Sequence, residues 1–125
     1  MTTLIKRVYE TPVVEDGTRV LVDRIWPRGL TKSAASIDLW LKDIAPSPEL
    51  RRWFSHRPER WESFRQHYLQ ALELQSDLVG QLVSFSLKGA LTLLYAARDQ
   101  ERNHAVVLRD YLVLQQADKQ ERVEV

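Results

Sequence analysis

The segment that most limits how this chain can fold is residues 90–97, ALTLLYAA, because it is apolar almost throughout. A strand buried on both faces shows a near-continuous apolar run, and this pattern is typical of a central strand in a parallel sheet. Parallel neighbours need long crossover connections, which are usually helical. Residues 90–97 therefore predict an α/β fold built around this strand.

Two further strands and one ambiguous segment precede it. We expect strands at residues 4–10 and 19–23, separated by a turn over residues 11–17 that contains proline and Asp-Gly. Proline and glycine also make residues 24–36 an expected loop without regular structure. Residues 37–44 fit both an alternating strand and one helical face, and we favour a short extended segment.

Helix signals fill the rest of the chain. Ser47 followed by proline and glutamate marks a helix start, and a second helix should run from residue 58 to about residue 74. Ser76 and Asp77 should cap a third helix that ends at Gly89. Asn103 should cap a last helix that ends near residue 116, before a polar tail (117–125) that should fray. The order of elements predicts one domain over residues 1–125, with a partly parallel sheet flanked by helices in Rossmann-like layers.

Composition excludes several classes of protein. The chain has 125 residues and no cysteine, which rules out disulfides, cysteine-ligated zinc and thiol nucleophiles. It shows neither a signal peptide nor a run of about 20 apolar residues, so we expect a cytoplasmic protein without a membrane partner. The net charge of +1 gives no general attraction to polyanions.

The first group of polar residues follows the strand at residues 19–23. Asp23, Arg24, Trp26 and Arg28 stand at the carboxyl end of that strand, where ligands bind in open α/β sheets. Arginine offers forked donors for phosphate or carboxylate, so we predict Arg24, Trp26 and Arg28 as ligand-binding residues. Asp23 is a candidate acid–base group. The structural alternative is that Asp23 holds an arginine internally while Trp26 fills the core.

The second group follows residues 90–97. Asp99 and His104 are candidate catalytic residues, and Asn103 with the start of its helix is a candidate anion-binding element. For these residues alone the structural alternative is favoured, in which Asp99 and Asn103 cap the helix and His104 bonds to backbone. If the two strands are parallel neighbours, both groups lie at one edge of the sheet.

The third group is a basic and aromatic segment. Residues 24–65 contain nine Lys or Arg and five Asp or Glu, and all four tryptophans lie between residues 26 and 61. Such a segment could bind single-stranded nucleic acid, although we expect Trp53 and Trp61 in the core and the arginines in solvent. His56 and His67 lack metal-ligand spacing, so no metal is expected. No glycine-rich nucleotide fingerprint is present, and no cofactor is expected.

Three stretches together are similar to one known family. VLVDRIWPRGLTK, DLWLKDIAPSPELRRWFSHRPERWESF and LTLLYAARDQERNHAVVL resemble the YeaO-like branch of the DUF488 family, over most of the chain. The resemblance implies a small cytoplasmic protein and brings no catalytic role with it. Arg57 departs from the acid expected before the proline, and the Cys-His-Arg motif of a longer branch has no cysteine here. The motif residues that match are Asp23, Arg24, Trp26, Pro27, Arg28, Gly29, Asp99, Asn103 and His104.

The leading functional prediction is a polar cleft that binds a small anionic ligand, such as a nucleotide or another phosphate compound. Hydrolysis would then involve Asp23, Asp99 and His104. Two alternatives remain open: a nucleic-acid-binding accessory protein, which is less favoured, and a non-catalytic interaction module. The sequence leaves the oligomeric state undetermined.

Overall fold

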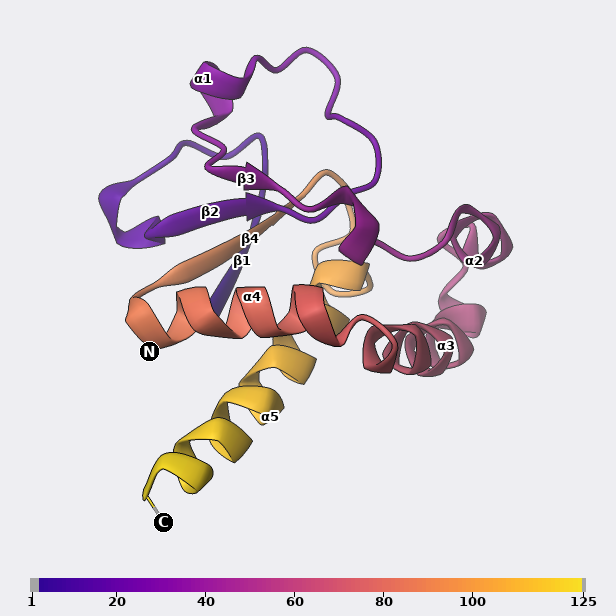
Figure 1. Cartoon of the computed structure of the whole chain (residues 1–125). Helices are drawn as coiled ribbons and strands as arrows, with labels where there is room; N and C mark the ends of the chain where they lie inside the picture. The colour runs from indigo at the N-terminus through magenta and orange to yellow at the C-terminus, as the bar shows by residue number, and fades with distance from the viewer. Residues whose placement is uncertain (1–2, 125) are drawn as a thin grey trace.

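The computed structural model describes residues 3–124, with side chains described for residues 3–117, and its centre is a parallel sheet. Four strands lie in the order β1-β4-β2-β3 (Figure 1). Their bounds are β1 Thr3–Arg7, β2 Thr18–Leu21, β3 Leu39–Trp40 and β4 Leu91–Tyr95. Strand β4 is parallel to both of its neighbours, β1 and β2, and all five of its residues are buried. The predictions of a central parallel strand and an α/β fold are confirmed.

One face of the sheet shares a hydrophobic core with three helices. Side chains alternate along β4, so Leu91, Leu93 and Tyr95 share the larger hydrophobic core. Helices α4 (Ser76–Lys88) and α5 (His104–Glu124) contact the strands on this face, and α3 (Trp61–Glu73) packs against both helices. They contribute Tyr68, Leu82 and Leu108 among others to that core. Apolar positions three and four residues apart explain why these segments are helical and which side they bury.

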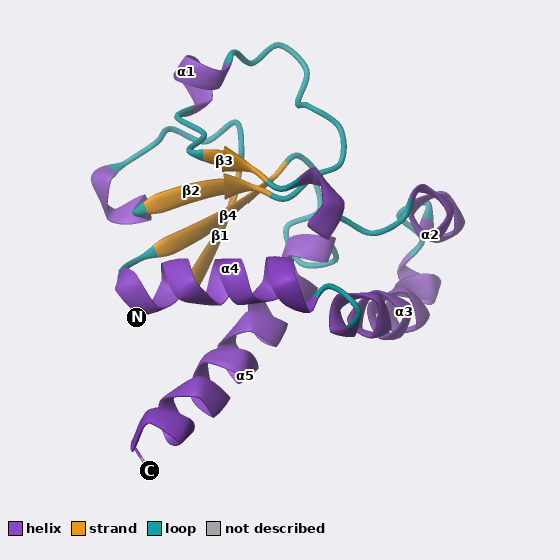
Figure 2. Cartoon of the chain, viewed as in Figure 1, coloured by secondary structure: helices purple, strands orange, loops and turns teal. Residues whose placement is uncertain are grey.

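The other face is covered by the chain between β2 and β3. A long loop crosses it and carries the short helix α1 (Lys32–Ala35), on the side of the sheet away from α4 (Figure 2). Leu21 and Leu94 pack here against Ala35 and Ile37. The expectation that residues 24–36 lack regular structure is wrong for α1, since Thr31 caps this single turn by accepting from the Ala34 N–H at 3.1 Å.

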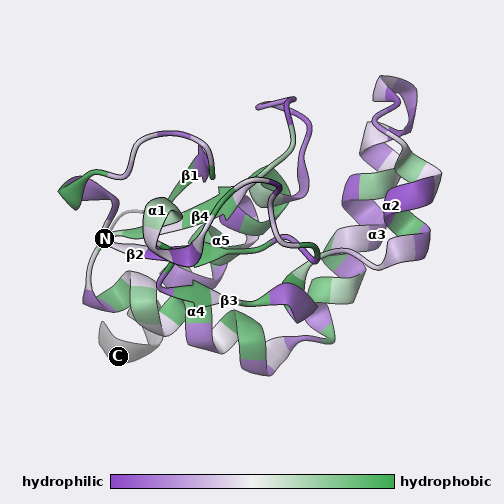
Figure 3. Ribbon diagram, turned by 90° about the horizontal axis from the view of Figure 1, so that it is seen from above, coloured by the Kyte–Doolittle hydropathy of each residue, from purple (hydrophilic) through white to green (hydrophobic). Residues whose placement is uncertain are grey.

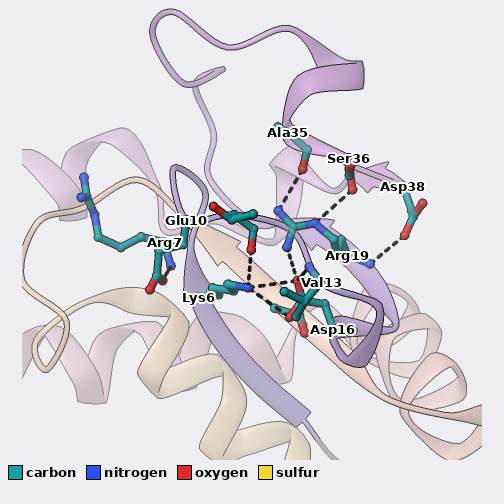
Figure 4. A network of polar contacts seen from close by, with 11 residues as sticks. Lys6, Arg7, Glu10, Val13, Asp16, Arg19, Ala35, Ser36 and Asp38 are labelled. Atoms are coloured by element: carbon teal, nitrogen blue, oxygen red, sulfur yellow. Dashed lines mark hydrogen bonds and ion pairs between the residues drawn. The ribbon is translucent and has the colours of Figure 1, made fainter.

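A buried ionic network fastens α1 to the sheet (Figure 4). Arg19 is only 3% exposed, and it donates to the carbonyls of Ala35 (2.9 Å) and Ser36 (3.1 Å) at the end of α1. Its guanidinium also pairs with Asp16, which receives Lys6 at 3.2 Å. Asp16 and Arg19 lie at the amino end of β2, away from the carboxyl edge of the sheet. We therefore assign this network a role in stabilising the fold.

Helix α2 (Pro48–Phe54) stands beyond one end of the sheet. It begins at Ser47 as predicted, with the Leu50 N–H donating to the Ser47 hydroxyl at 3.1 Å. Helices α2 and α3 lie beside each other past the end toward which the strand arrows point (Figure 1). Three short 3-10 turns connect these elements: η1 Val14–Asp16, η2 Lys42–Ile44 and η3 Pro58–Arg60. The carboxyl edge of the sheet therefore faces a helical wall.

Several element ends differ from the expected ones. The extended segment at 37–44 is a strand only over Leu39–Trp40, because η2 follows it. Helix α4 has no side-chain cap, and Gly89 at its end is extended (φ 170), a conformation open to any residue. Helix α5 continues to Glu124, past the predicted end near residue 116. Over residues 3–124, no helix has the length and apolar character needed to cross a bilayer.

Figure 3 shows how hydropathy follows these layers. The strands and the inward sides of the helices are largely hydrophobic, while the loops around them are mostly hydrophilic. Helices α2 and α3 stand apart from the sheet in this view and carry hydrophilic bands on their outer turns. A polar site between the sheet edge and these helices is consistent with this arrangement.

Candidate functional site

A cleft of about 580 Å³ opens at the carboxyl edge of the sheet. After β2 the chain passes to α1 on one face, and after β4 it passes to α5 on the other. Divergence of two neighbouring parallel strands to opposite faces leaves a crevice, and ligands of open α/β sheets bind there. Strands β2 and β4 are parallel neighbours, so the condition under which both strand ends share one edge is met. The cleft is lined by Asp23, Arg24, Ile25, Pro46, Pro48, Arg51, Arg52, Phe54, Ser55, His56, Phe64, Ala96, Ala97, Arg102, Asn103 and His104.

Asp23 connects the two strand ends at the base of the cleft. Asp23 stands two residues after the end of β2, and Ala96 is the first residue after β4. Oδ2 of Asp23 accepts the Ala96 N–H at 3.0 Å. Its backbone carbonyl accepts the indole N–H of Trp40 at 2.7 Å, which ties β3 to the same point. Asp23 is 8% exposed, so it is a buried carboxylate held by backbone and side-chain donors. The alternative in which Asp23 holds an arginine is wrong, because its ionic neighbour is His104.

His104 begins α5 and points back to the end of β2. Its Nε2 lies 3.0 Å from the Val22 carbonyl oxygen and 3.1 Å from Oδ1 of Asp23. Both neighbours are acceptors, so Nε2 carries the hydrogen. The hydrogen bond of His104 Nε2–H goes to the Val22 carbonyl oxygen. Among the described residues, no donor makes a hydrogen bond of good geometry to Oδ1 of Asp23. The ring of Tyr68 packs edge-on against the imidazole at 6.2 Å.

Tyr68 fixes the wall behind the histidine. Its hydroxyl donates to the Ile44 carbonyl at 2.7 Å and so joins α3 to η2. Burial raises the pKa of Tyr68 well above its usual value, with a smaller contribution from the charge of Asp23. Tyr68 therefore stays protonated and acts as a permanent hydrogen-bond donor to the backbone.

Asn103 and Asp99 are occupied by the backbone. Asn103 is 3% exposed; its Oδ1 caps α5 by accepting the Val106 N–H at 3.0 Å, and its Nδ2 donates to the Asp99 carbonyl. Oδ1 of Asp99 accepts the N–H groups of Arg102 (3.0 Å) and Glu101 (2.9 Å), and these bonds hold the pKa of Asp99 below its usual value. The predicted capping by Asn103 is confirmed, whereas Asp99 closes the preceding turn.

The wall and rim of the cleft are basic. Four arginines line it, and Asp23 is the one acid among the lining residues. Arg24 donates to the carbonyls of Ala45 (3.1 Å) and Pro46 (3.4 Å), which holds the chain before α2 against the strand end. Among the described side chains, Arg51 has no acidic partner within ion-pair distance. The other three arginines pair only loosely, Arg24 with Asp43 at 3.8 Å, Arg52 with Glu49 at 3.9 Å and Arg102 with Asp99 at 3.7 Å.

Helix α2 ends at the cleft in a strained turn. Ser55 and His56 are consecutive non-glycine residues in the left-handed region, with φ of 47 and 54. Such residues cost free energy and are found most often at functional sites. Both line the cleft, and the His56 ring lies 5.8 Å from that of Phe54. The sequence carries no glycine or asparagine here that would signal this conformation.

The structure brings four of the seven predicted site residues into the cleft, namely Asp23, Arg24, Asn103 and His104. Trp26, Arg28 and Asp99 do not line it. The Trp26 indole donates to the Leu30 carbonyl at 2.7 Å and packs on Trp40 with ring centroids 5.3 Å apart. Arg28 is exposed on the loop.

Four basic residues of the lining were not predicted as site residues. Arg51, Arg52, His56 and Arg102 reach the cleft only because α2 and the turn before α5 close around the sheet edge. The basic and aromatic segment noted in the sequence contains Arg51, Arg52 and His56, but it gave no indication that they face the sheet edge. Trp53 was expected in the core and is 42% exposed, so that prediction is wrong. In the described part of the chain, no group of three or more His, Asp or Glu residues is placed so that it could hold a metal ion.

Comparisons with known proteins agree on one family. The model of the family described as the inactive DUF488-N3 subclade matches residues 2–124. The uncharacterized protein YeaO of Escherichia coli (strain K12) is 43% identical over 86% of this chain and 93% of its own length. The uncharacterized proteins Rv3073c of Mycobacterium tuberculosis (strain ATCC 25618 / H37Rv) and Mb3100c of Mycobacterium bovis (strain ATCC BAA-935 / AF2122/97) are each 42% identical over 86% of this chain and 91% of theirs. No solved structure matches the chain. By the family model and by these relatives, the chain belongs to the DUF488 family, in the branch that contains YeaO.

Proposed function

We propose that this DUF488 protein binds a small phosphate compound in the cleft at the carboxyl edge of its sheet. The observation that carries the proposal is the charge of the lining, four arginines against one buried carboxylate. Guanidinium groups bind phosphate through paired, charge-assisted hydrogen bonds. The volume of about 580 Å³ falls within the range of about 300–1,000 Å³ that small-molecule sites occupy.

Arg51 is the main candidate for the phosphate contact. Arg24 already donates twice to the backbone, and Arg52 and Arg102 each have a distant acidic neighbour. Arg51 has no such partner among the described side chains, so its donors are available at no cost in lost ion pairs. We assign Arg52 and Arg102 a supporting role, since exposed ion pairs of nearly 4 Å contribute little and exchange readily.

We propose binding without turnover. The matching subclade is described as inactive, and the polar atoms of Asn103 and Asp99 are already used by the backbone. Asp23 and His104 serve first as a connection between β2, β4 and α5. We therefore expect no phosphate release from bound esters, and release by wild type that is lost on substitution of Asp23, Asp99 or His104 would instead support the predicted role of these residues in proton transfer.

Calorimetric titration with inorganic pyrophosphate tests the proposal. Wild type should bind it, and Arg51→Ala should weaken the affinity by about tenfold, the loss expected from one charge-assisted contact. Arg28→Ala is the matched control, because Arg28 is exposed and lies outside the cleft lining. Sodium chloride at equal ionic strength controls for screening. Equal affinity of the two variants, or no binding by wild type, would contradict the proposal.

A nucleic-acid interface is the second candidate, and one observation favours it. Trp53 is 42% exposed and carries the Arg60 guanidinium 5.1 Å from its ring centre. The neighbouring arginines pair with acids on the same surface, Arg57 with Glu59 at 4.0 Å and Arg65 with Glu62 at 2.7 Å, which lowers the local charge. Single-stranded oligonucleotides should therefore bind weakly at low salt, and Trp53→Ala should abolish that binding if this surface is used.

A further inference from the structure

The cleft has an apolar side as well as a basic one. Ile25 follows the buried Asp23 by two residues and is 69% exposed, and it lines the cleft together with Pro48. Phe54 and Phe64 also line the cleft; they are 6% and 2% exposed, and their rings stack at a centroid distance of 4.5 Å. A ligand that reached this side would cover Ile25 and remove its apolar surface from water.

A simple anion can contact the basic side of the cleft, but it has no apolar surface to place against the apolar side. Inorganic phosphate would contact arginine and leave Ile25, Pro48 and most of the 580 Å³ to water. Single exposed apolar residues are common, so exposure alone says little. Ile25 is informative because it stands in the wall of a cleft that also holds four guanidinium groups.

We infer that the cleft selects phosphate esters that carry a flat apolar ring, the chemistry of a nucleoside monophosphate, over phosphate or sugar phosphate alone. The inference rests on the proposed function. The phosphate contacts Arg51, and the ring lies against Ile25 and Pro48. Small-molecule sites generally combine apolar surface with polar groups that fix orientation, and this cleft contains both.

Three probes separate the contributions of the two sides. AMP carries phosphate, sugar and ring, ribose 5-phosphate lacks the ring, and adenosine lacks the phosphate. Wild type should bind AMP at least about tenfold more tightly than ribose 5-phosphate, the gain expected from burying one large apolar side chain against a ring. Adenosine should bind more weakly than AMP, because it leaves the arginines without an anion.

Variants of Ile25 localise the preference. Ile25→Ser should weaken AMP binding by about tenfold and leave ribose 5-phosphate unchanged, while Ile25→Val should keep most of the preference. Leu74→Ser is the matched control, because Leu74 is 88% exposed at the end of α3 and does not line the cleft. Melting of the unliganded variants checks that each is folded, and exposure of both sites makes unfolding unexpected.

The outcomes distinguish this inference from the function on which it rests. If AMP and ribose 5-phosphate bind equally, or if Ile25→Ser weakens both to the same degree, the ring selection is overturned while phosphate binding stands. If none of the phosphate compounds binds wild type, the proposed function and the inference fail together. If adenosine binds as tightly as AMP, the ring alone is recognised and the arginine contact is overturned.

Discussion

Nε2 of His104 lies 3.1 Å from Oδ1 of Asp23, and this contact joins the first turn of α5 to the end of β2. Oδ2 of the same carboxylate holds the first residue after β4 at 3.0 Å. Two segments about eighty residues apart in the chain are thus fixed at one point. The cleft exists because this point holds the two strand ends together while their loops diverge.

Asp23→Asn should destabilise the fold by about 2 kcal/mol. The amide NH2 of the new side chain would face either the Nε2–H of His104 or the N–H of Ala96. In both orientations two donors face each other, so one buried donor would lack an acceptor. Urea unfolding followed by circular dichroism measures the change. Asp43→Asn, at a carboxylate whose side chain is 72% exposed, should alter stability by less than about 0.5 kcal/mol. Similar effects of the two substitutions would contradict this structural role.

The central strand and its neighbour could be predicted from sequence because their patterns are local. An apolar run in residues 90–97 signals burial on both faces, and Ser47 signals a helix start, without knowledge of any other segment. Trp53 shows the limit of such reasoning. Its helical position predicted burial, but only the packing of α2 decides whether anything covers that face, and what lies over the ring is Arg60.

The cleft itself was only half predictable, for the same reason. Asp23 and His104 follow and precede recognisable elements, so strand adjacency places them at one edge. Arg51 and His56 reach that edge through the position of α2, which depends on Arg24 binding the chain at Ala45. Contacts of this kind join residues far apart in sequence and leave no periodic signal. Arg28 was expected among them, but its loop turns it to solvent.

Asp16 should make stability fall in acid. Burial raises the pKa of Asp16 and is the largest single effect, but hydrogen bonds from the Val13 N–H, Lys6 and Arg19 together hold it below its usual value. A carboxyl group whose pKa is lower in the folded state stabilises above its unfolded pKa of about 3.9, and this contribution is lost as pH falls through the folded pKa.

Denaturation of Asp16→Asn from pH 7 to pH 2.5 checks this expectation. The variant should be less stable than wild type by about 3 kcal/mol near neutrality, because it leaves Arg19 buried without its anion. The difference should shrink below about pH 4 as the wild-type carboxylate is protonated. A difference that stayed constant with pH would show that Asp16 does not act through its charge. Asp77→Asn, at an exposed acid on α4, is the control and should follow wild type.

Two glycines should respond in opposite directions to alanine. Gly17 has φ of +64, and a Cβ there would lie 2.2 Å from the Ala90 carbonyl oxygen, so Gly17→Ala should cost at least about 2 kcal/mol. Gly80 lies inside α4 with open space around it, and Gly80→Ala should stabilise by about 0.5–1 kcal/mol. Thermal unfolding distinguishes the two, and a stabilised Gly17→Ala would refute the close approach of the η1 turn to β4.

Ser55→Gly should stabilise the protein although it removes a side chain. Ser55 is left-handed with φ of 47, and glycine relieves about 1 kcal/mol of that strain. Ser63→Gly, at an exposed position inside α3, should instead destabilise by about 0.5–1 kcal/mol. If both substitutions destabilise equally, the turn after α2 is not strained in solution.

The measurement that tests the account most directly is a two-dimensional 15N–1H titration of the wild-type protein with inorganic pyrophosphate. Arg24, Ala97, Arg102 and Asn103 line the cleft, and their amide signals should shift together along one saturable curve. The amides of Gly17, Thr18 and Gly89, which line the second cavity at the opposite edge of the sheet, should stay in place. Shifts confined to that second cavity, or scattered over the surface without saturation, would contradict an anion site at the ends of β2 and β4.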